Sequence, residues 1–549
     1  MRPELERPEP ERLLHDTLRT ANRVAAERVA IHAGPRTHTY GELWEDAQRL
    51  AAALQVRGLS RGQRVVLYLE NSYTCCVAIY GVLIAGGVFV VVNPQTKADK
   101  LAYVLHDCEA QVAITEKRLS IELSKALEER ALVKTVLCAE PVGGKEPATA
   151  CGLVPLEDLG EVLSNSAPAP QTPPTIACDL AALIYTSGST GQPKGVMMTH
   201  QSMLFTVYSL LQYLRLDNSH RIVAMLPLAF DYGLYQLLMA VAAGATLILE
   251  RSFTYPGKIL ESVQQREATV FPGVPTLYAM LIAMHRKSPL CLPSVQRVTN
   301  TAAALPAEYL KELQEIFPNA LIFKMYGLTE CKRVCYLEPE LLWERPRSVG
   351  KAIPGTEVLL LSPDGDEVPT GEPGILHVRG PHVMRGYLNL PESTARMLKP
   401  GPLPWEPMLC TGDWFRMDDE GFLYFIGRSD DIIKSRGEKV SPVEVENCLH
   451  AMPGIREAAV VGVQDAVLGQ AIRAVVAVEA DAALDARSVQ RWCAAHLENF
   501  MVPQQILFVP ELPKGQTGKI AKTGLAELPY EAAGSGRTER EPNVTGSIK

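Results

Sequence analysis

One loop of the chain has residue types that suit the binding of a polyphosphate. Residues 185–195 read YTSGSTGQPKG and follow the apolar run 181–184, so a buried strand leads into a flexible polar loop. Its glycines let backbone N–H groups converge on an anion, while its hydroxyl groups and Lys194 add donors and a positive charge. The residues expected to contact phosphate groups are Thr186, Ser187, Gly188, Ser189, Thr190, Gly191 and Lys194.

The loop is not the phosphate loop of Walker-type nucleotide hydrolases. That motif requires the spacing G-x4-G-K-[ST], which residues 185–195 do not contain. The pair Gly518-Lys519 does not supply it either, because Pro513 stands where the first glycine should be and Ile520 follows the lysine. Another kind of nucleotide chemistry is therefore indicated.

The loop resembles that of the AMP-forming adenylating enzymes, the superfamily of acyl-CoA synthetases, peptide-synthetase adenylation domains and firefly luciferase. Four further segments resemble motifs of this family and follow in the family's order. They are residues 326–330 (YGLTE), 410–413 (CTGD), 427–446 (GRSDDIIKSRGEKVSPVEVE) and 512–519 (LPKGQTGK). Five motifs in the same order make a chance resemblance implausible.

The resemblance implies a nucleotide site formed by residues far apart in the sequence. Tyr326 would lie against adenine, with Thr329 in the same motif, and Asp413 would accept both ribose hydroxyls. Arg428 would contact the ribose, and Glu330 would hold Mg2+. These residue types suit the roles, since a hard carboxylate binds Mg2+ and an aspartate is a natural acceptor for a diol.

The implied reaction makes an acyl-adenylate. A carboxylate attacks the α-phosphate of ATP and pyrophosphate leaves, so charge screening and alignment matter more than a general base. The catalytic candidates are Lys519, Thr186, Lys194 and Glu330, and Lys519 would bridge the carboxylate and the α-phosphate. The family then swings its C-terminal domain at a hinge, a position that Asp430 occupies here, so that a thiol can attack the acyl group.

The predicted enzyme is an AMP-forming acid–thiol ligase that uses ATP and Mg2+, with coenzyme A as the expected co-substrate and a small carboxylic acid as substrate. The acceptor could instead be a free-standing carrier protein or another nucleophile. A catalytically silent nucleotide-binding protein is disfavoured, because Glu330, Asp413, Arg428 and Lys519 are all present.

The substrate pocket is expected around Phe230, Asp231 and Tyr232, with Arg333 nearby. In amino-acid-activating relatives, an aspartate in a similar F-D motif binds the substrate's amino group. Asp231 could therefore indicate an amino acid or an amino-bearing aryl acid, as in secondary metabolism, or it could cap a helix that begins near Tyr232. Lys332 and Arg333 point to a polar or anionic feature near the pocket, or to a solvated rim. A ligase for medium or long fatty acids remains the alternative.

Two departures from the family's pattern affect this region. Residues 301–305 (TAAAL) replace the usual glycine-rich segment that lines the nucleotide and acyl sites. Because that contact is made largely by backbone, ATP binding should survive while the acyl pocket changes. Lys324 replaces a residue that is commonly smaller and polar.

The elements that must position these residues follow an α/β pattern. Residues 75–92 carry no charge, yet Gly86-Gly87 divide them into a helical stretch and the strand-like run 88–92. Residues 234–249 repeat this arrangement around Gly244. Two such units predict a buried parallel sheet rather than a membrane span.

The fold class expected is α/β, with a large N-terminal body of α/β subdomains, a small β region after residue 386 and a mobile, smaller α+β C-terminal domain. The expected boundaries are 1–428 for the adenylate-forming body, 429–525 for the mobile domain and 526–549 for a disordered tail. The proline-rich residues 165–174 are expected to link subdomains.

Composition narrows the function classes. The chain has 549 residues, too many for one compact core, and its 47% hydrophobic and 21% charged residues are typical of globular proteins. A net charge of -8 disfavours a nucleic-acid-binding protein, so any polyanion must be held locally. The twelve cysteines lack a disulfide-like spacing, and the acidic, proline-containing N-terminus does not resemble a signal peptide, so a cytoplasmic protein is expected.

Overall fold

The fold was obtained as a computed structural model. It describes residues 11–128, 132–139, 150–151, 154–187, 192–253, 255–301, 305–429, 431–435, 438–465, 468–479, 482–515, 520–522 and 524–530. The chain divides into two units, and it passes from the first to the second between Ile426 and Gly427.

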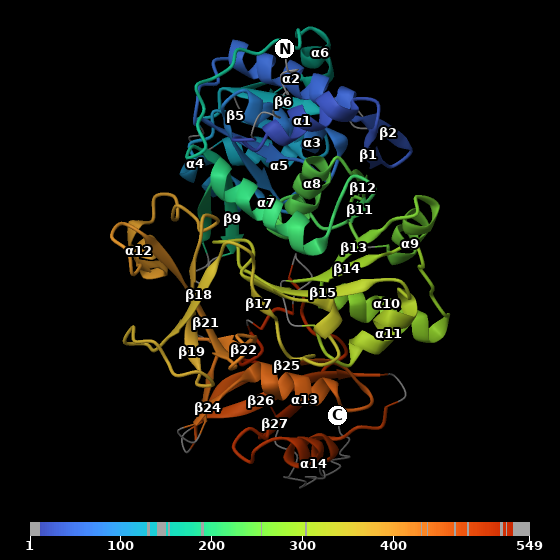
Figure 1. The fold of residues 1–549 in the computed structure, drawn as a ribbon, viewed down its shortest axis with the longest axis vertical. Coiled ribbons are helices and arrows are strands. Elements are labelled where there is room, and N and C mark those ends of the chain that lie inside the picture. Colours follow the sequence, from blue (N-terminus) through green and yellow to red (C-terminus); the bar gives the residue numbers. More distant parts are fainter. Residues whose placement is uncertain are drawn as a thin grey trace, which may run out of the picture. The chain divides into compact units, whose positions relative to one another are not determined.

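An eight-stranded sheet, which we call the first sheet, forms one half of the first unit (Figure 1). Its spatial order is β10-β9-β4-β3-β5-β6-β8-β7, and neighbouring strands are parallel except for the outermost pair at each edge. The strands are β3 (Arg64–Tyr68), β4 (Val88–Val92), β5 (Val112–Glu116), β6 (Thr135–Ala139), β7 (Ala150–Cys151), β8 (Val154–Asp158), β9 (Leu180–Ser187) and β10 (Pro193–Thr199).

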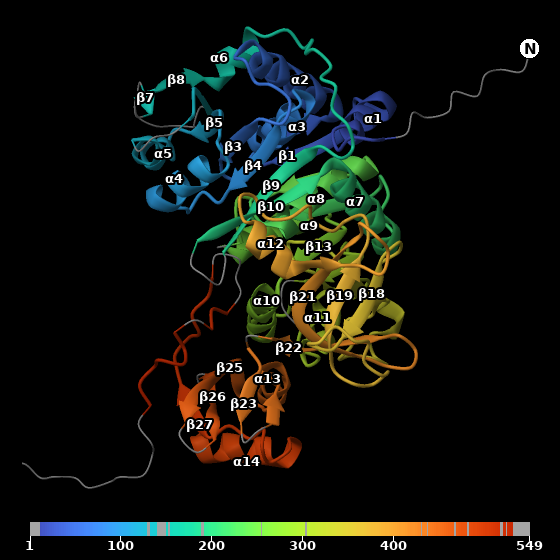
Figure 2. The ribbon, with the colours of Figure 1, turned by 90° about the vertical axis from the view of Figure 1, so that its left-hand side faces the viewer.

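Both faces of the first sheet are buried. In β3, Val65 and Leu67 belong to one apolar core and Val66 and Tyr68 to another, because successive strand side chains point to opposite faces. Figure 2 shows helices on the two sides of this sheet. Helices α2 (Tyr40–Val56) and α3 (Tyr73–Ile84) contribute to the first core, and α4 (Ala98–Asp107) and α5 (Ser120–Leu127) to the second.

The uncharged segment 75–92 forms the predicted helix and strand. Helix α3 ends at Ile84, Gly86 adopts a φ of +81°, and the strand β4 is buried along its whole length. A side chain at Gly86 would also come within 2.8 Å of Pro173. Among the described residues, none of the helices combines the length and the apolar character that a membrane span requires.

The sequence predicted that the proline-rich residues 165–174 link two subdomains. In the structure they connect two strands of the same sheet. They lie between α6 (Leu159–Ser164) and β9, and both β8 before them and β9 after them belong to the first sheet. The connector therefore carries the chain from one end of that sheet to a strand beside β4. Its prolines suit an extended path that needs no ladder of backbone hydrogen bonds.

A nine-stranded sheet, the second sheet, forms the other half of the first unit, in the order β17-β16-β15-β14-β13-β11-β12-β1-β2. Strands β1 and β11 to β15 run parallel to one another. The antiparallel strand β2 follows β1 at one edge, and the antiparallel strands β16 and β17 follow β15 at the other. The strands are β1 (Val29–Ala33), β2 (Arg36–Thr39), β11 (Arg221–Ala224), β12 (Thr246–Leu249), β13 (Val270–Gly273), β14 (Arg297–Asn300), β15 (Leu321–Tyr326), β16 (Cys335–Leu337) and β17 (Lys351–Ala352).

Six helices pack with the strands of the second sheet into the same large core that covers one face of the first sheet. They are α1 (Asp16–Ala25), α7 (His200–Leu214), α8 (Asp231–Ala243), α9 (Pro256–Gln265), α10 (Pro275–Lys287) and α11 (Tyr309–Ile316). The predicted helix–glycine–strand unit at 234–249 is confirmed as α8, Gly244 and β12. One continuous core therefore joins the two sheets, and the expected α/β class is confirmed.

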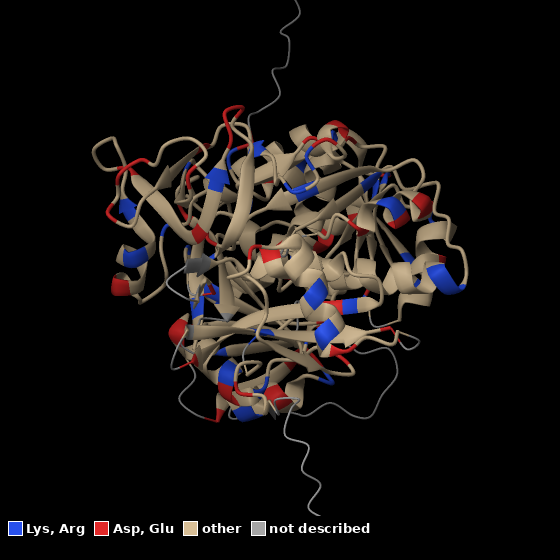
Figure 3. Ribbon diagram, turned by 90° about the horizontal axis from the view of Figure 1, so that it is seen from below, with Lys and Arg blue, Asp and Glu red and all other residues tan. Residues whose placement is uncertain are grey.

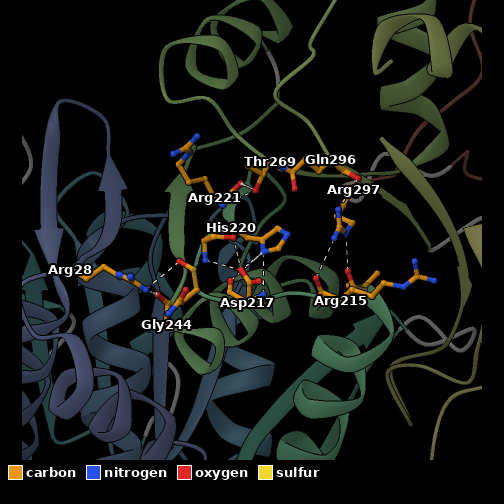
Figure 4. A network of polar contacts seen from close by, with 12 residues as sticks. Arg28, Arg215, Asp217, His220, Arg221, Gly244, Thr269, Gln296 and Arg297 are labelled. Carbon is orange, nitrogen blue, oxygen red and sulfur yellow. Dashed lines mark hydrogen bonds and ion pairs between the residues drawn. The ribbon is translucent and has the colours of Figure 1, made fainter. Parts of the chain in front are cut away.

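Polar contacts at the amino ends of β11, β13 and β14 fix the start of this sheet (Figure 4). The Thr269 hydroxyl accepts from the Arg221 backbone N–H at 2.8 Å, and the backbone N–H groups of Gln296 and Arg297 donate to the Thr269 carbonyl. The Arg297 guanidinium reaches the Leu214 carbonyl at 3.0 Å. These contacts fix the relative positions of the three strands at their amino ends, which lie opposite the carboxyl ends that carry the candidate site.

The small β region predicted after residue 386 is part of a five-stranded, mostly antiparallel sheet, in which β22 pairs with β21. Its strands are β18 (Glu357–Leu361), β19 (Gly374–Arg379), β20 (Leu398–Pro400), β21 (Pro407–Met417) and β22 (Leu423–Arg428), with α12 (Pro391–Met397) beside them and the short 3-10 helix η1 (Pro339–Leu341) preceding them. The region starts before residue 386, because β18 and β19 precede it.

The second unit is an α+β domain with its own core. Its elements are β23 (Ile433–Ser435), β24 (Glu438–Val440), α13 (Pro442–His450), β25 (Ile455–Asp465), β26 (Gly469–Val478), α14 (Ala486–His496) and β27 (Gln505–Phe508). The predicted tail began at 526, yet Leu528 packs against this unit and its carbonyl accepts from Arg473 at 2.8 Å. The packed chain thus continues to residue 530.

Charged residues of both signs are interspersed over the elements (Figure 3), as the modest net charge of -8 requires. All eleven cysteines whose side chains the structure describes are free thiols.

Two buried histidines of the first unit give its stability a defined pH dependence. Burial lowers the pKa of His15 to about 4 and that of His200 to about 3, and the His200 Nδ1 accepts a hydrogen bond from the Leu14 backbone N–H at 3.0 Å. The unfolded chain therefore binds more protons below pH of about 6.5, and stability should fall as the pH drops from about 6.5 towards 4. Each histidine should contribute up to about 1.4 kcal/mol per pH unit.

His200→Asn isolates this contribution, because the amide oxygen can accept the same hydrogen bond but does not titrate. Urea midpoints measured between pH 7.5 and 5 should fall less steeply for the variant than for the wild type. Equal slopes for the two proteins would contradict the prediction.

Candidate active site

The stem of the phosphate loop is a hairpin of β9 and β10. Thr186 lies directly opposite Lys194 in its register, so the two side chains are on the same face. The Tyr185 hydroxyl donates to the Asp107 Oδ2 at 2.6 Å and ties the stem to α4. The turn of the loop, Gly188 to Gly191, is outside the described residues, as is the Ser187 side chain. The described stem brings two of the predicted phosphate ligands together.

Tyr387 connects the phosphate-loop stem to Glu330. Residues 385–388 pair with β10 through backbone hydrogen bonds, including Leu388 N to Gly195 O at 2.8 Å, and this pairing places the Tyr387 ring. The Lys194 Nζ is 5.3 Å from the ring centroid, and the Tyr387 hydroxyl donates to the Glu330 Oε1 at 2.6 Å. The predicted phosphate and magnesium ligands are therefore held on one scaffold.

A tight turn after β15 presents Glu330. The Lys332 N–H donates to the Leu328 carbonyl at 2.7 Å, and Lys332 itself adopts a left-handed φ of +67°. A Cβ atom on Gly327 would lie 2.1 Å from the Lys332 carbonyl oxygen, so only glycine allows this close approach. The sequence YGLTE thus forms a compact turn whose shape depends on its glycine.

Tyr326 and Asp413 meet, as their predicted roles require. The Tyr326 hydroxyl donates to the Asp413 Oδ2 at 2.5 Å, and burial together with the Asp413 carboxylate raises the pKa of Tyr326 well above its usual range. The Thr411 hydroxyl accepts from the Asp413 N–H at 3.1 Å and fixes the adjacent backbone. A ribose and an adenine ring can therefore find a buried acceptor and an aromatic face side by side.

A predicted pocket residue, the altered segment and the predicted magnesium ligand follow the carboxyl ends of three parallel strands of the second sheet. Asp231 comes after β11, Thr301 after β14 and Glu330 after β15, at the sheet edge where ligands of α/β proteins bind. The Thr299 carbonyl of β14 accepts from the hydroxyls of Tyr232 at 2.7 Å and Tyr278 at 2.8 Å, which locks α8 and α10 against this edge. Residues 302–304 of the altered segment are outside the described part.

Asp231 does not cap α8. The helix begins at Asp231 itself with Phe230 at the N-cap, and the Asp231 Oδ1 accepts only from the adjacent Tyr232 N–H, at 2.9 Å, among the interactions of the described chain. Asp231 is 7% exposed and lines a small cavity with apolar residues of β4 and β9. The capping interpretation is therefore wrong, and a buried carboxylate is left beside the predicted pocket.

Lys332 and Arg333 are buried and do not form a solvated rim. Lys332 is 1% exposed and Arg333 4% exposed, and burial lowers the pKa of Lys332 to about 8. The Arg333 guanidinium carbon lies 5.1 Å from the centroid of the Tyr232 ring, on the first turn of α8. Arg333 thus lies against the first turn of α8, and the charge of Asp231 acts on Lys332.

Three predicted residues cannot be placed in this site. Arg428 is an exposed residue at the end of β22, in the second unit, and Asp430 and Lys519 are outside the described residues. Thr329 lies in the turn between Leu328 and Glu330 and is partly buried.

Comparisons with known proteins agree with this geometry. A family model for AMP-binding enzymes matches residues 18–388, and one for the AMP-binding enzyme C-terminal domain matches residues 444–519. The chain belongs to the AMP-binding enzyme family. It is an AMP-forming acid–thiol ligase that uses ATP, Mg2+ and coenzyme A.

Two curated relatives and one solved structure illustrate the range of this AMP-binding family. The chain is 31% identical to a long-chain-fatty-acid–CoA ligase of Bacillus subtilis (95% of each chain). It is also 31% identical to a feruloyl-CoA synthase of Amycolatopsis sp (91% of this chain, 96% of the other). The crystal structure of an anthranilate CoA ligase in complex with anthranoyl-AMP matches with a TM-score of 0.86 and 26% identity, over 94% of this chain and 97% of that one.

The described residues of this AMP-binding enzyme fit Mg2+ bound together with ATP. Magnesium takes one or two protein carboxylates and completes its shell with phosphates and water. The Glu330 carboxylate, positioned by Tyr387, is a single hard ligand of this kind. The ion would neutralise phosphate charge, while Lys194 and the loop hydroxyls would orient the phosphates.

Sequence reasoning missed Tyr387 and Asn71. The buried Asn71 side chain donates to the Leu226 and Glu250 carbonyls, at 3.0 Å each, and accepts from the Leu228 N–H at 2.9 Å. It therefore fixes the segment that leads to Asp231. The signals available were weak: an asparagine before a helix, and a tyrosine after Gly386.

Tyr387→Phe should lower kcat for ATP–pyrophosphate exchange about tenfold and raise the Mg2+ concentration needed for half-maximal activity. The ring that supports Lys194 stays in place, but Glu330 loses its hydrogen-bond donor. Titrations of Mg2+ at saturating ATP would measure the effect. An unchanged Mg2+ dependence would contradict this positioning role.

Proposed function

We propose that this AMP-binding enzyme activates a small carboxylic acid that carries an amino group and transfers the acyl group from AMP to coenzyme A. The observation that supports the substrate is Asp231. Its carboxylate stands at the start of α8 beside the predicted pocket and, among the described residues, accepts only a local backbone hydrogen bond. A buried carboxylate that lacks an ion-pair partner is a suitable acceptor for an ammonium group.

One of the comparisons supports a small amino-bearing acid. The anthranilate CoA ligase whose structure resembles this chain was crystallised with anthranoyl-AMP, the adenylate of an aminobenzoic acid. The fatty-acid ligase relative supports the alternative of a longer acyl chain. A buried carboxylate at the pocket wall suits a polar acid better than an alkyl chain, because an alkyl chain offers it no hydrogen-bond donor.

The proposed residue roles follow the family's motifs. Thr186, Ser187, Gly188, Ser189, Thr190, Gly191 and Lys194 would hold the phosphates, and Tyr326, Thr329, Asp413 and Arg428 the nucleoside. Lys519 would act on the α-phosphate, Asp430 would serve as the hinge, and Phe230, Asp231, Tyr232 and Arg333 would form the acid pocket. We also propose a cytoplasmic location, which the free cysteine thiols of the described chain support.

The test is product analysis with ATP, coenzyme A and a panel of aminobenzoic acids, amino acids and fatty acids. Acyl-CoA and AMP should form with amino-bearing acids, and mass spectrometry identifies both products. Asp231→Asn should raise KM for the amino-bearing acid while KM for ATP stays unchanged. Activity confined to unfunctionalised fatty acids would overturn the amino-group role, and activity only with a carrier protein would overturn the choice of acceptor.

A further inference from the structure

The buried cations Lys332 and Arg333 have polar atoms that find no partner among the described residues. The Lys332 Nζ and the Arg333 Nε are shielded from solvent, and neither forms a hydrogen bond within the described chain. The Arg333 Nη1 donates to the Lys332 carbonyl at 2.6 Å, so one part of the guanidinium is satisfied and the Nε is not. Buried polar groups are normally paired, and an ammonium group is the most costly one to leave unpaired.

The nearby carboxylates do not pair with these unsatisfied donors in the described part of the chain. Asp231 and Glu330 attract Lys332 electrostatically, yet neither forms an ion pair with it among the described residues. Glu330 is already bound by the Tyr387 hydroxyl. The cations therefore keep capacity for another acceptor within the described part of the chain.

The backbone at Lys332 is shaped to hold this arrangement. Lys332 adopts a left-handed φ of +67°, which is uncommon for a lysine, and Gly327 makes room for its carbonyl group. Strained, over-determined conformations of this kind cluster at ligand-binding sites. Here the turn keeps two consecutive cations inside the protein next to the first turn of α8.

We propose that Lys332 and Arg333 form an anion subsite that binds a second carboxylate of the acid substrate. The inference rests on the proposed function and narrows its substrate class. The acid would carry one carboxylate that is activated, an amino group that Asp231 binds and a further carboxylate that Lys332 and Arg333 bind. A carboxylate offers lone pairs to both the ammonium and the guanidinium group, so it satisfies both free donors at once.

Matched pairs of acids test the subsite. Aspartate is compared with asparagine, glutamate with glutamine, and 2-aminoterephthalate with anthranilate, each in ATP–pyrophosphate exchange. The diacid should have the higher kcat/KM by about 10- to 100-fold in at least one pair, because the neutral analogue leaves buried cations unpaired. If every neutral member is equal to or better than its diacid, the subsite is overturned while the proposed function stands.

Lys332→Met and Arg333→Met keep most of the packing volume and remove the charge. Each should raise KM for the preferred diacid by about tenfold or more and bring the ratio within its pair towards one, while KM for ATP is retained. Lys311→Met, which removes an exposed lysine of α11, should leave that ratio unchanged. A structural role alone would change stability without changing the ratio, and that result would overturn the subsite.

Direct binding gives a readout that does not depend on turnover. The preferred diacid should raise the melting temperature of the wild-type protein, and the shift should be lost in Arg333→Met. An equal shift in both proteins would contradict the subsite. If no acid of any kind supports exchange, the proposed function itself fails, and the subsite fails with it.

Discussion

Gly327→Ala should lower ATP–pyrophosphate exchange by about 10²-fold or more, with little change in overall folding. The added Cβ would lie 2.1 Å from the Lys332 carbonyl oxygen and 2.9 Å from the Arg333 Cα, and these are backbone atoms that cannot rotate away. The turn after β15 must therefore open. Its opening displaces Glu330, and displacements of about 1 Å at a reacting centre cost about that much in rate.

The matched control is Gly257→Ala in α9. A Cβ on Gly257 meets no atom within 4 Å, so this variant adds the same methyl group in a helix without a clash. It should keep wild-type exchange and melt at an equal or higher temperature, because alanine favours helix more than glycine does. Exchange within threefold of wild type for Gly327→Ala would show that the turn tolerates the methyl group and would refute the argument.

Local sequence patterns predicted the elements well where burial decides the structure. The run 88–92 is strand β4, because five consecutive apolar residues without a polar face suit a parallel strand covered on both sides. The helix–glycine–strand pattern at 234–249 is α8 followed by β12. In both cases the signal is local, since the glycine ends the helix and the apolar residues follow directly.

The connector at 165–174 shows what local sequence patterns cannot predict. Its prolines correctly exclude helix and central strand, but they carry no information about which strands they join. That β9 inserts beside β4, in the sheet that the chain has just left, depends on strand pairing between residues almost a hundred positions apart. Long-range pairing of this kind is not encoded in composition.

In the candidate site, too, some residues could be predicted from local motifs and others only from the fold. Motifs identified Tyr326, Glu330 and Asp413, and the structure brings Tyr326 into contact with Asp413. Tyr387 was not predicted, because its role comes from a backbone pairing with β10 that only the fold reveals. The burial of Lys332 could not be predicted from the sequence either, because a lysine after a turn is normally exposed to solvent.

Lys519→Ala should abolish ATP–pyrophosphate exchange, with a loss of about 10³-fold or more. Lys519 is the last residue matched by the family's C-terminal domain model, in the segment that resembles the family's lysine motif. The ammonium group would neutralise charge that develops on the α-phosphate as pyrophosphate leaves, and a methyl group cannot replace it. Exchange at the wild-type rate would refute the assignment.

Lys514→Gln is the control in the same segment. The Lys514 Nζ lies 2.8 Å from carboxylate oxygens of both Glu457 and Glu511, so its charge is used within the second unit. Glutamine can still donate to these carboxylates, and exchange should persist. Loss of exchange in both variants would indicate a general electrostatic or folding effect rather than a specific role of Lys519.

The two half-reactions separate a role of Lys519 in the adenylation step from a general role in protein structure. Formation of the adenylate would need a cation at the α-phosphate while pyrophosphate leaves. Attack of a thiol on a preformed acyl-adenylate occurs at the acyl carbon, and AMP leaves with one additional negative charge on its phosphate after the proposed domain swing has removed Lys519. Lys519→Ala supplied with synthetic acyl-adenylate and coenzyme A should therefore form thioester at close to the wild-type rate. If thioester formation fails as well, the substitution acts through protein structure, and the specific adenylation role is refuted.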